Sequence, residues 1–346
     1  MRTLKYKLLL PTLFLTSCAA PWALAHSELP EYPPESHAPA GVMFDHLHAK
    51  GEWMLGYRYG RETYRDIYRG SSEAGTMELQ MAGYTMKPVS MTMEMYMLDI
   101  MYAVSDDLTL MLMPQYMSMD MSMVMIGSGH GAGHSQHTGD RRHSTSGVGD
   151  TVIAGLFRLA NTHNLRLHAT LGLSAPTGSV KERGPNGNLT HYGMQLGSGT
   201  WDLLSSLTYT SGLERLSWGA QLSARLPLEE ENDSGFAFGE RYGATAWSAF
   251  RVADWLSISA RLEYAKEGDI NGHYEGPHNH SSPPDRQGNY GGNYSAYGLG
   301  VNLVGQRGLF AGTRLGLEWL STLSADYNGY QLAREDGLNM SLSYAF

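Results

Sequence analysis

The sequence predicts an all-β protein, a transmembrane antiparallel β-barrel of about 12 strands with short periplasmic turns and long extracellular loops. Three observations support this class: an export signal at the N-terminus, no apolar run after it that could form a membrane helix, and an alternating strand pattern that ends on Phe346. We therefore expect a signal peptide at 1–25, a Pro-rich periplasmic N-terminal extension at 26–50 and an outer-membrane β-barrel at 51–346.

The first 25 residues have the composition of a secretory signal. Three basic residues precede a short apolar stretch at 8–15, and residues 23–25 form a small-x-small cleavage site. Cys18 ends a stretch that also fits lipoprotein processing, which would leave a lipidated N-terminus. We favour cleavage after Ala25, because an integral barrel needs no lipid anchor.

Composition excludes several function classes. Cys18 is the only cysteine, so a chain cleaved after Ala25 has no thiol for a disulfide or a thiolate metal site. The formal net charge of −9 argues against a nucleic-acid partner.

Between the two ends, segments of alternating polarity have the lengths of tilted membrane strands, and the connections between them alternate between short and long. A soluble β-sandwich would also alternate, but it would leave the pattern of connections unexplained. An even strand number places both termini in the periplasm. The expected strands are 51–59, 91–104, 108–125, 148–160, 165–175, 200–210, 215–227, 239–251, 255–267, 292–304, 309–322 and 337–346.

The C-terminal segment 338–346 carries apolar side chains at every second position up to the terminal aromatic residue. This pattern is similar to the signal that the barrel-assembly machinery recognises in outer-membrane proteins. We therefore expect Phe346 to engage that machinery and outer-membrane lipid to surround the folded barrel.

Methionines occupy alternate positions of one predicted hairpin. In 91–104 and 108–125 the even positions are apolar or aromatic and suit lipid, so the odd positions face the lumen. A turn at 105–107 then places Met91 opposite Met121, Met93 opposite Met119, and Met95 opposite Met117.

These thioethers and a following histidine-rich loop are candidate metal ligands. Thioethers suit Cu(I) or Ag(I), whereas imidazoles bind divalent ions such as Cu(II), so the implied metal is Cu(I) or Cu(II), although no cofactor is certain. Further histidines lie in other predicted outer loops, and His46 and His48 lie near the periplasmic end. The candidate ligands are Met91, Met93, Met95, Met97, Met117, Met119, Met121, Met123, His130, His134, His137 and His143.

Less specific interpretations of the methionines, histidines and charged residues stay open. Methionine also fills gaps in apolar surfaces, so the wall could be a slide for hydrophobic solutes, and the histidine loop could be merely solvated. Charged residues on the predicted strands could tune a pore or fill it with ion pairs. We find no nucleophile elbow, nucleotide loop or zinc-protease motif, and we expect no enzyme activity.

Several segments resemble a known family. Residues 42–48, 51–54, 91–97, 146–150 and 194–200 resemble proteobacterial outer-membrane proteins that are labelled as transporters and are similar to the MetA-pathway phenol-degradation barrels. The resemblance covers nearly the whole mature chain. It implies passage of aromatic compounds, and the Met- and His-rich segments of many relatives suggest heavy-metal handling.

The sequence thus favours an outer-membrane transporter or channel that binds or conducts copper-like soft metal ions through a Met-lined lumen. One alternative is a channel for small hydrophobic or aromatic compounds. Another is a structural barrel whose loops contact partners at the cell surface.

Overall fold

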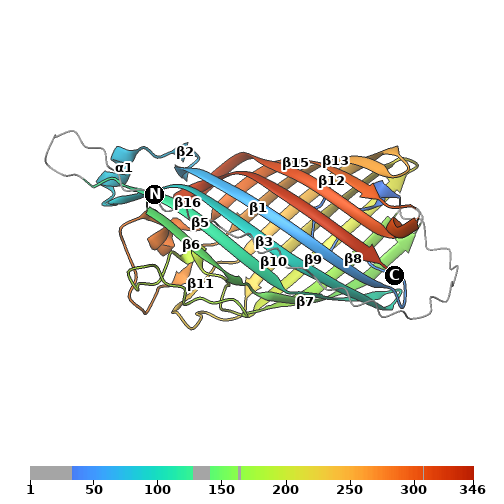
Figure 1. The fold of residues 1–346 in the computed structure, drawn as a ribbon, viewed down its shortest axis with the longest axis horizontal. Coiled ribbons are helices and arrows are strands. Elements are labelled where there is room, and N and C mark those ends of the chain that lie inside the picture. The colour runs from blue at the N-terminus through green and yellow to red at the C-terminus, as the bar shows by residue number, and fades with distance from the viewer. Residues whose placement is uncertain (1–32, 128–140, 163–164, 307) are drawn as a thin grey trace, which may run out of the picture. The chain divides into compact units, whose positions relative to one another are not determined.

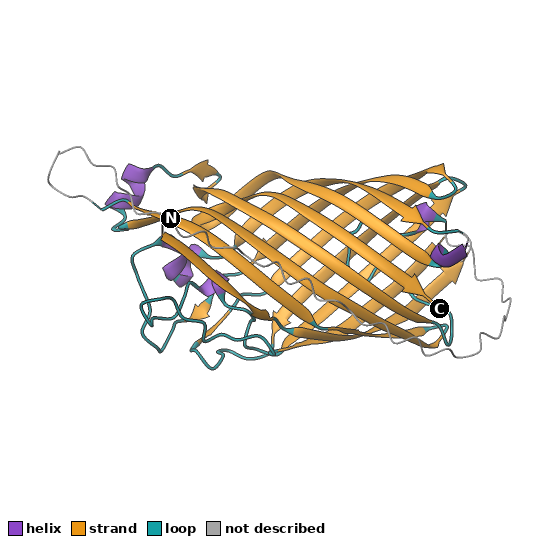
Figure 2. Ribbon diagram, viewed as in Figure 1, coloured by secondary structure: helices purple, strands orange, loops and turns teal. Residues whose placement is uncertain are grey.

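The computed structural model describes residues 33–127, 141–162, 165–306 and 308–346. The contacts divide the chain into 1–32 and 33–346, and the second unit is the one described here. It is built of strands in one large antiparallel sheet (Figures 1 and 2), and none of the helices among the described residues is long and apolar enough to cross a membrane.

The strands are β1 (Trp53–Gly70), β2 (Ser72–Glu73), β3 (Met86–Ser105), β4 (Leu108–Met113), β5 (Gln115–Met125), β6 (Arg141–Val148), β7 (Thr151–Thr162), β8 (Leu165–Ala175), β9 (Asp202–Leu213), β10 (Leu216–Pro227), β11 (Phe236–Ala237), β12 (Arg241–Ala253), β13 (Leu256–Glu267), β14 (Asn271–Gly272), β15 (Gly292–Val304) and β16 (Thr313–Ala345). The helices are short: α1 (Thr76–Met81) and the 3-10 turns η1 (Pro34–Ser36), η2 (Tyr192–Met194), η3 (Pro283–Asp285), η4 (Gln287–Asn289) and η5 (Gly308–Phe310).

The sheet closes on itself because β1 pairs with both β16 and β3. The closed ring is β1-β16-β15-β13-β12-β10-β9-β8-β7-β4-β3, with β2, β5 and β6 outside it in the same sheet and β11 and β14 as a separate pair. The predicted closed antiparallel barrel is confirmed. At the β1–β16 seam, Trp53 and Phe346 exchange two backbone hydrogen bonds of 2.9 Å, so pairing continues to the last residue.

The two parts of the 33-residue strand β16 lie beside each other. Its first part pairs with β15 and its second part with β1. Asn339 Nδ2 donates to Glu318 Oε2 at 3.2 Å, and the Ala345 N–H donates to the Gly312 carbonyl at 3.4 Å. The sequence predicted a loop at 323–336, whereas the structure continues the strand there.

The predicted facing of the methionine hairpin is confirmed. Met101 and Met111 are 3% exposed, whereas Leu110 and Leu112 on either side of Met111 are 47% and 41% exposed. Alternation along each strand therefore separates an inner face from an outer one.

The predicted register is also confirmed, with Met91↔Met121, Met93↔Met119 and Met95↔Met117 as Cα partners. β4 and β5 both pair with β3, and they meet at Pro114, whose carbonyl accepts the Leu98 N–H at 3.1 Å. Pro114 has no N–H to donate, which suits the break between the two strands.

The two ends of the barrel differ. Short turns join β3 to β4, β9 to β10 and β12 to β13, and they lie at what we call the short-turn end. Connections of 15 residues or more link β1 to β3, β8 to β9 and β13 to β15 at the long-connection end. β1 and β3 run further towards that end than the expected 51–59 and 91–104, which shortens the predicted 60–90 connection to 71–85.

Residues 33–50 fold into the barrel at the short-turn end, and we call this segment the plug. The expected extension covers 26–50, and its described part packs on inward-facing side chains. Ser257 Oγ donates to the Pro34 carbonyl at 3.0 Å, and the Glu35 carboxylate accepts two hydrogen bonds from Arg251 Nε at 2.8 and 2.9 Å. The Gly41 N–H donates to Glu318 Oε2 at 2.9 Å.

Candidate functional site

A buried methionine cluster lines the inner face of β3 and β5. Met119, Met121 and Met123 are each no more than 3% exposed, because Met194 and Leu196 from the β8–β9 connection pack onto them from inside. The cluster brings together six of the eight predicted methionine ligands: Met91, Met93, Met117, Met119, Met121 and Met123.

A second methionine cluster continues the wall towards the short-turn end. It contains Met54, Met101 and Met111, and the plug covers it with Met43 and Phe44. The predicted ligand Met97 packs here, and Met95 lies against Gly60 of β1. Together the two clusters form the methionine wall, an apolar and polarizable layer along one side of the barrel interior that the plug and the β8–β9 connection cover.

A chain of buried and partly buried polar groups flanks the first methionine cluster. His143, which was predicted in a loop, lies in β6 with Met121 as its Cα partner. Its Nδ1 is 3.1 Å from His191 Nε2, and the two rings stack with centroids 5.1 Å apart. His191 Nδ1 is 2.7 Å from Asp285 Oδ1 of η3. The predicted ligands His130, His134 and His137 lie outside the described residues.

The partner of His191, Asp285, was not predicted from the sequence. Burial alone would raise the pKa of the Asp285 carboxyl, but the hydrogen bond and charge of His191 hold that pKa below its usual range. Asp285 is 94 residues from His191 and follows two prolines in a loop, so no spacing rule could pair the two. A carboxylate on one ring nitrogen orients the other nitrogen, as is common for metal-binding histidines.

The charged residues inside the barrel form ion pairs. Arg261 Nε lies 2.7 Å from Glu318 Oε1, and both side chains are at most 5% exposed. Arg58 Nε is 2.6 Å from Asp99 Oδ2. The charges of these two pairs therefore neutralise each other. This matches the second role that the sequence left open, in which ion pairs fill the lumen.

A cavity of about 260 Å³ lies between the plug and the wall opposite the methionines. Its plug side is formed by 41–44, and its barrel side includes Gln221, Arg225 and Glu263. The lumen thus has one apolar wall and one polar wall.

No protein-family model matches the sequence, and no curated protein matches it. Among solved structures, the COG4313 outer membrane channel from Pseudomonas putida F1 is similar, with 17% identity, a TM-score of 0.57, and coverage of 88% of this chain and 98% of that one. A FadL homologue from Pseudomonas aeruginosa matches with 12% identity and a TM-score of 0.40, covering 86% of this chain and 90% of its own.

The CymD monoaromatic hydrocarbon channel matches with 9% identity and a TM-score of 0.37, covering 86% of this chain and 88% of its own. At these identities the likeness concerns the fold. The similarity to the COG4313 channel confirms, for the fold, the resemblance to proteobacterial outer-membrane barrels that was expected from the sequence.

Proposed function

We propose that the protein is an outer-membrane channel for small hydrophobic solutes, including aromatic ones. The observation that carries this proposal is the methionine wall, an apolar side of the barrel interior that lies beneath the β8–β9 connection and the plug. Flexible, polarizable thioethers adapt to solutes of different shape. The fold similarity to a solved outer-membrane channel supports the general class.

The proposal includes a location and an orientation. The outward faces of the strands carry large apolar side chains, which suit lipid, and short turns usually face the periplasm. The self-contacts of β16 support twelve crossings, because its two parts then count as separate strands. We therefore propose that the plug lies on the periplasmic side of the outer membrane. We also propose that the strand ending at Phe346 is presented to the assembly machinery, and that the signal peptide is cleaved after Ala25.

A second candidate function is conduction of a soft metal ion such as Cu(I). The specific observation is that six predicted methionine ligands share one cluster and that His143 lies opposite Met121. Two or three converging thioethers can hold Cu(I), and several such sets could exchange it along the wall.

One variant separates the two candidates. In it, Met91, Met93, Met117, Met119, Met121 and Met123 are all changed to leucine, which keeps the wall apolar at similar volume. A control changes Met77 and Met81 of α1, which are 73% and 77% exposed and away from the wall. Uptake of a labelled aromatic compound would be measured in cells with an intact lipopolysaccharide layer, and Cu(I) affinity by competition with a chelator.

The hydrophobic channel predicts uptake above that of cells without the protein, and little change of uptake in the wall variant. The metal channel predicts at least a tenfold loss of Cu(I) affinity in the wall variant and none in the control. Aromatic uptake no faster than in cells without the protein would overturn the first proposal. Equal Cu(I) affinity in all three proteins would overturn the second.

A further inference from the structure

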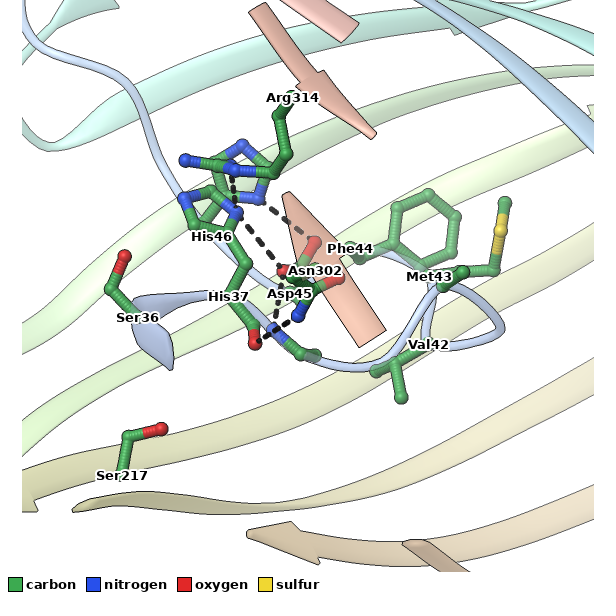
Figure 3. Close-up of polar contacts among 12 residues, drawn as sticks. Ser36, His37, Val42, Met43, Phe44, Asp45, His46, Ser217, Asn302 and Arg314 are labelled. Carbon is green, nitrogen blue, oxygen red and sulfur yellow. Dashed lines mark hydrogen bonds and ion pairs between the residues drawn. The ribbon is translucent and has the colours of Figure 1, made fainter. Parts of the chain in front are cut away.

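A second group of potential ligands lies in the plug (Figure 3). His46 Nδ1 is 2.8 Å from Asp45 Oδ1, and His37 Nδ1 is 3.7 Å from Asp45 Oδ2. The rings of His37 and His46 meet edge to face with centroids 4.4 Å apart. One potential ligand atom from each of the three residues lies within 4.8 Å of the other two.

Two imidazole nitrogens in this group have no hydrogen-bond partner among the described atoms. They are Nε2 of His46 and Nε2 of His48, and both are shielded from solvent. Leaving a buried polar atom without a partner is unfavourable, because the atom loses its hydrogen bond to water, so such atoms normally have a partner. The ring centroids of His46 and His48 are 4.9 Å apart, so the two unpartnered nitrogens belong to neighbouring rings.

Each of these two histidines is held by a carboxylate through its other nitrogen. Asp45 contacts His46 Nδ1, and Glu52 Oε2 lies 3.4 Å from His48 Nδ1. Metal-binding histidines show this arrangement, because the carboxylate fixes the ring and leaves the remaining nitrogen lone pair directed at the ion. The contacts with Asp45 and Glu52 account for the two Nδ1 atoms but leave both Nε2 atoms without a partner among the described residues.

The charge around the group is mixed. Asp45 and Glu52 attract a cation, whereas the Arg314 guanidinium contacts His37 Nδ1 and repels one. Arg314 comes from β16, so the group joins the plug to the barrel wall. An ion bound here would therefore tie the plug to its position.

We propose that His37, Asp45 and His46, with His48 as a fourth ligand, bind one divalent transition-metal ion of the Zn(II) or Cu(II) class. Imidazole nitrogens and a carboxylate oxygen suit these borderline ions, whereas the methionine wall suits a soft monovalent one. The site lies in the plug and is independent of which solute the channel takes.

The test must first remove competing histidines. In the starting protein for all measurements, which we call the background, His130, His134 and His137 are changed to serine, because a histidine-rich, glycine-rich loop binds divalent ions by itself. The folded background protein in detergent, stripped with a chelator, would be titrated with Co(II), a spectroscopic substitute for Zn(II), and then with Zn(II) as competitor. We expect one ion per chain and a Co(II) visible spectrum typical of low coordination number.

Two variants and a matched control locate the ion. His46→Gln should weaken binding at least tenfold, because it removes a ligand nitrogen. Arg314→Gln should tighten binding, because it removes the opposing positive charge. The control is His168→Gln, a buried histidine that contacts the plug through the Phe44 carbonyl at 2.8 Å but lies outside the group; its affinity should equal that of the background.

Three results would overturn the proposal: no ion bound by the background, equal affinity in His46→Gln, or weaker binding in Arg314→Gln. Because Arg314→Gln is expected to gain affinity, a misfolded His46→Gln protein would still leave the proposal testable. Solute uptake is not the readout, so this proposal can fail while the channel proposal stands.

Discussion

At the scale of single residues, the charges inside the barrel are held by one another and by the plug. Glu318 is 1% exposed, pairs with Arg261 and accepts the Gly41 N–H. A buried charge is tolerated only when it is paired and hydrogen-bonded. Glu318 therefore stabilises the barrel wall through Arg261 and also holds the plug through Gly41.

We expect Glu318→Gln to lower the free energy of unfolding by about 3 kcal/mol, because Arg261 loses its closest carboxylate in a buried site. The matched control is Glu335→Gln, whose ion pair with Arg65 has side chains 51% and 60% exposed. That change should stay within about 0.5 kcal/mol. Urea unfolding followed by tryptophan fluorescence measures both, and equal effects would contradict the buried pair's role.

The facing and pairing of the methionines could be predicted from the sequence, because a strand has a period of two and one hairpin turn fixes its register. The His143–His191–Asp285 chain could not, since it depends on loops that fold inward. His37, Asp45 and His46 lie close together in sequence, yet their convergence depends on the plug's turn and on Arg314 from β16.

At the scale of elements, the plug was the least predictable part of the fold. Its prolines give no periodic pattern, and some of its contacts are with small polar residues such as Ser257, which carry no hydropathy signal. β16 posed the opposite difficulty, because polar residues at 323–336 indicated a loop where backbone pairing continues.

The plug should limit conduction through the lumen. A Cβ added at Gly41 would lie 2.5 Å from both Glu318 Oε2 and Asn339 Nδ2, so Gly41→Val must shift the plug or its seat. We expect a larger single-channel conductance in planar bilayers, because the short-turn end becomes less obstructed. Gly75→Val is the control, since nothing lies within 4 Å of its added Cβ. Unchanged conductance in Gly41→Val would argue that the plug does not limit the path.

At the scale of the whole molecule, the inward face is polar or thioether-lined, while the outward face carries aliphatic side chains. Leu222 on β10 is 61% exposed, and Ile258 and Leu262 on β13 are 50% and 60% exposed. In water such a surface would favour aggregation, whereas in lipid it is the expected exterior of a barrel. The sequence predicted this division because each strand alternates, even though its loops did not all lie where expected.

If lipid covers this surface, an outward charge near the middle of a strand must be costly. Leu262 lies near the centre of β13, so Leu262→Arg should lower the free energy of unfolding in lipid vesicles by about 2–4 kcal/mol. Leu228 is 56% exposed and follows the end of β10, so Leu228→Arg should cost at most about 1 kcal/mol. Urea titration of both variants in vesicles gives the comparison. Because lipid penalises charge by depth whereas water does not, equal small costs at the two positions would mean that this band does not face a membrane.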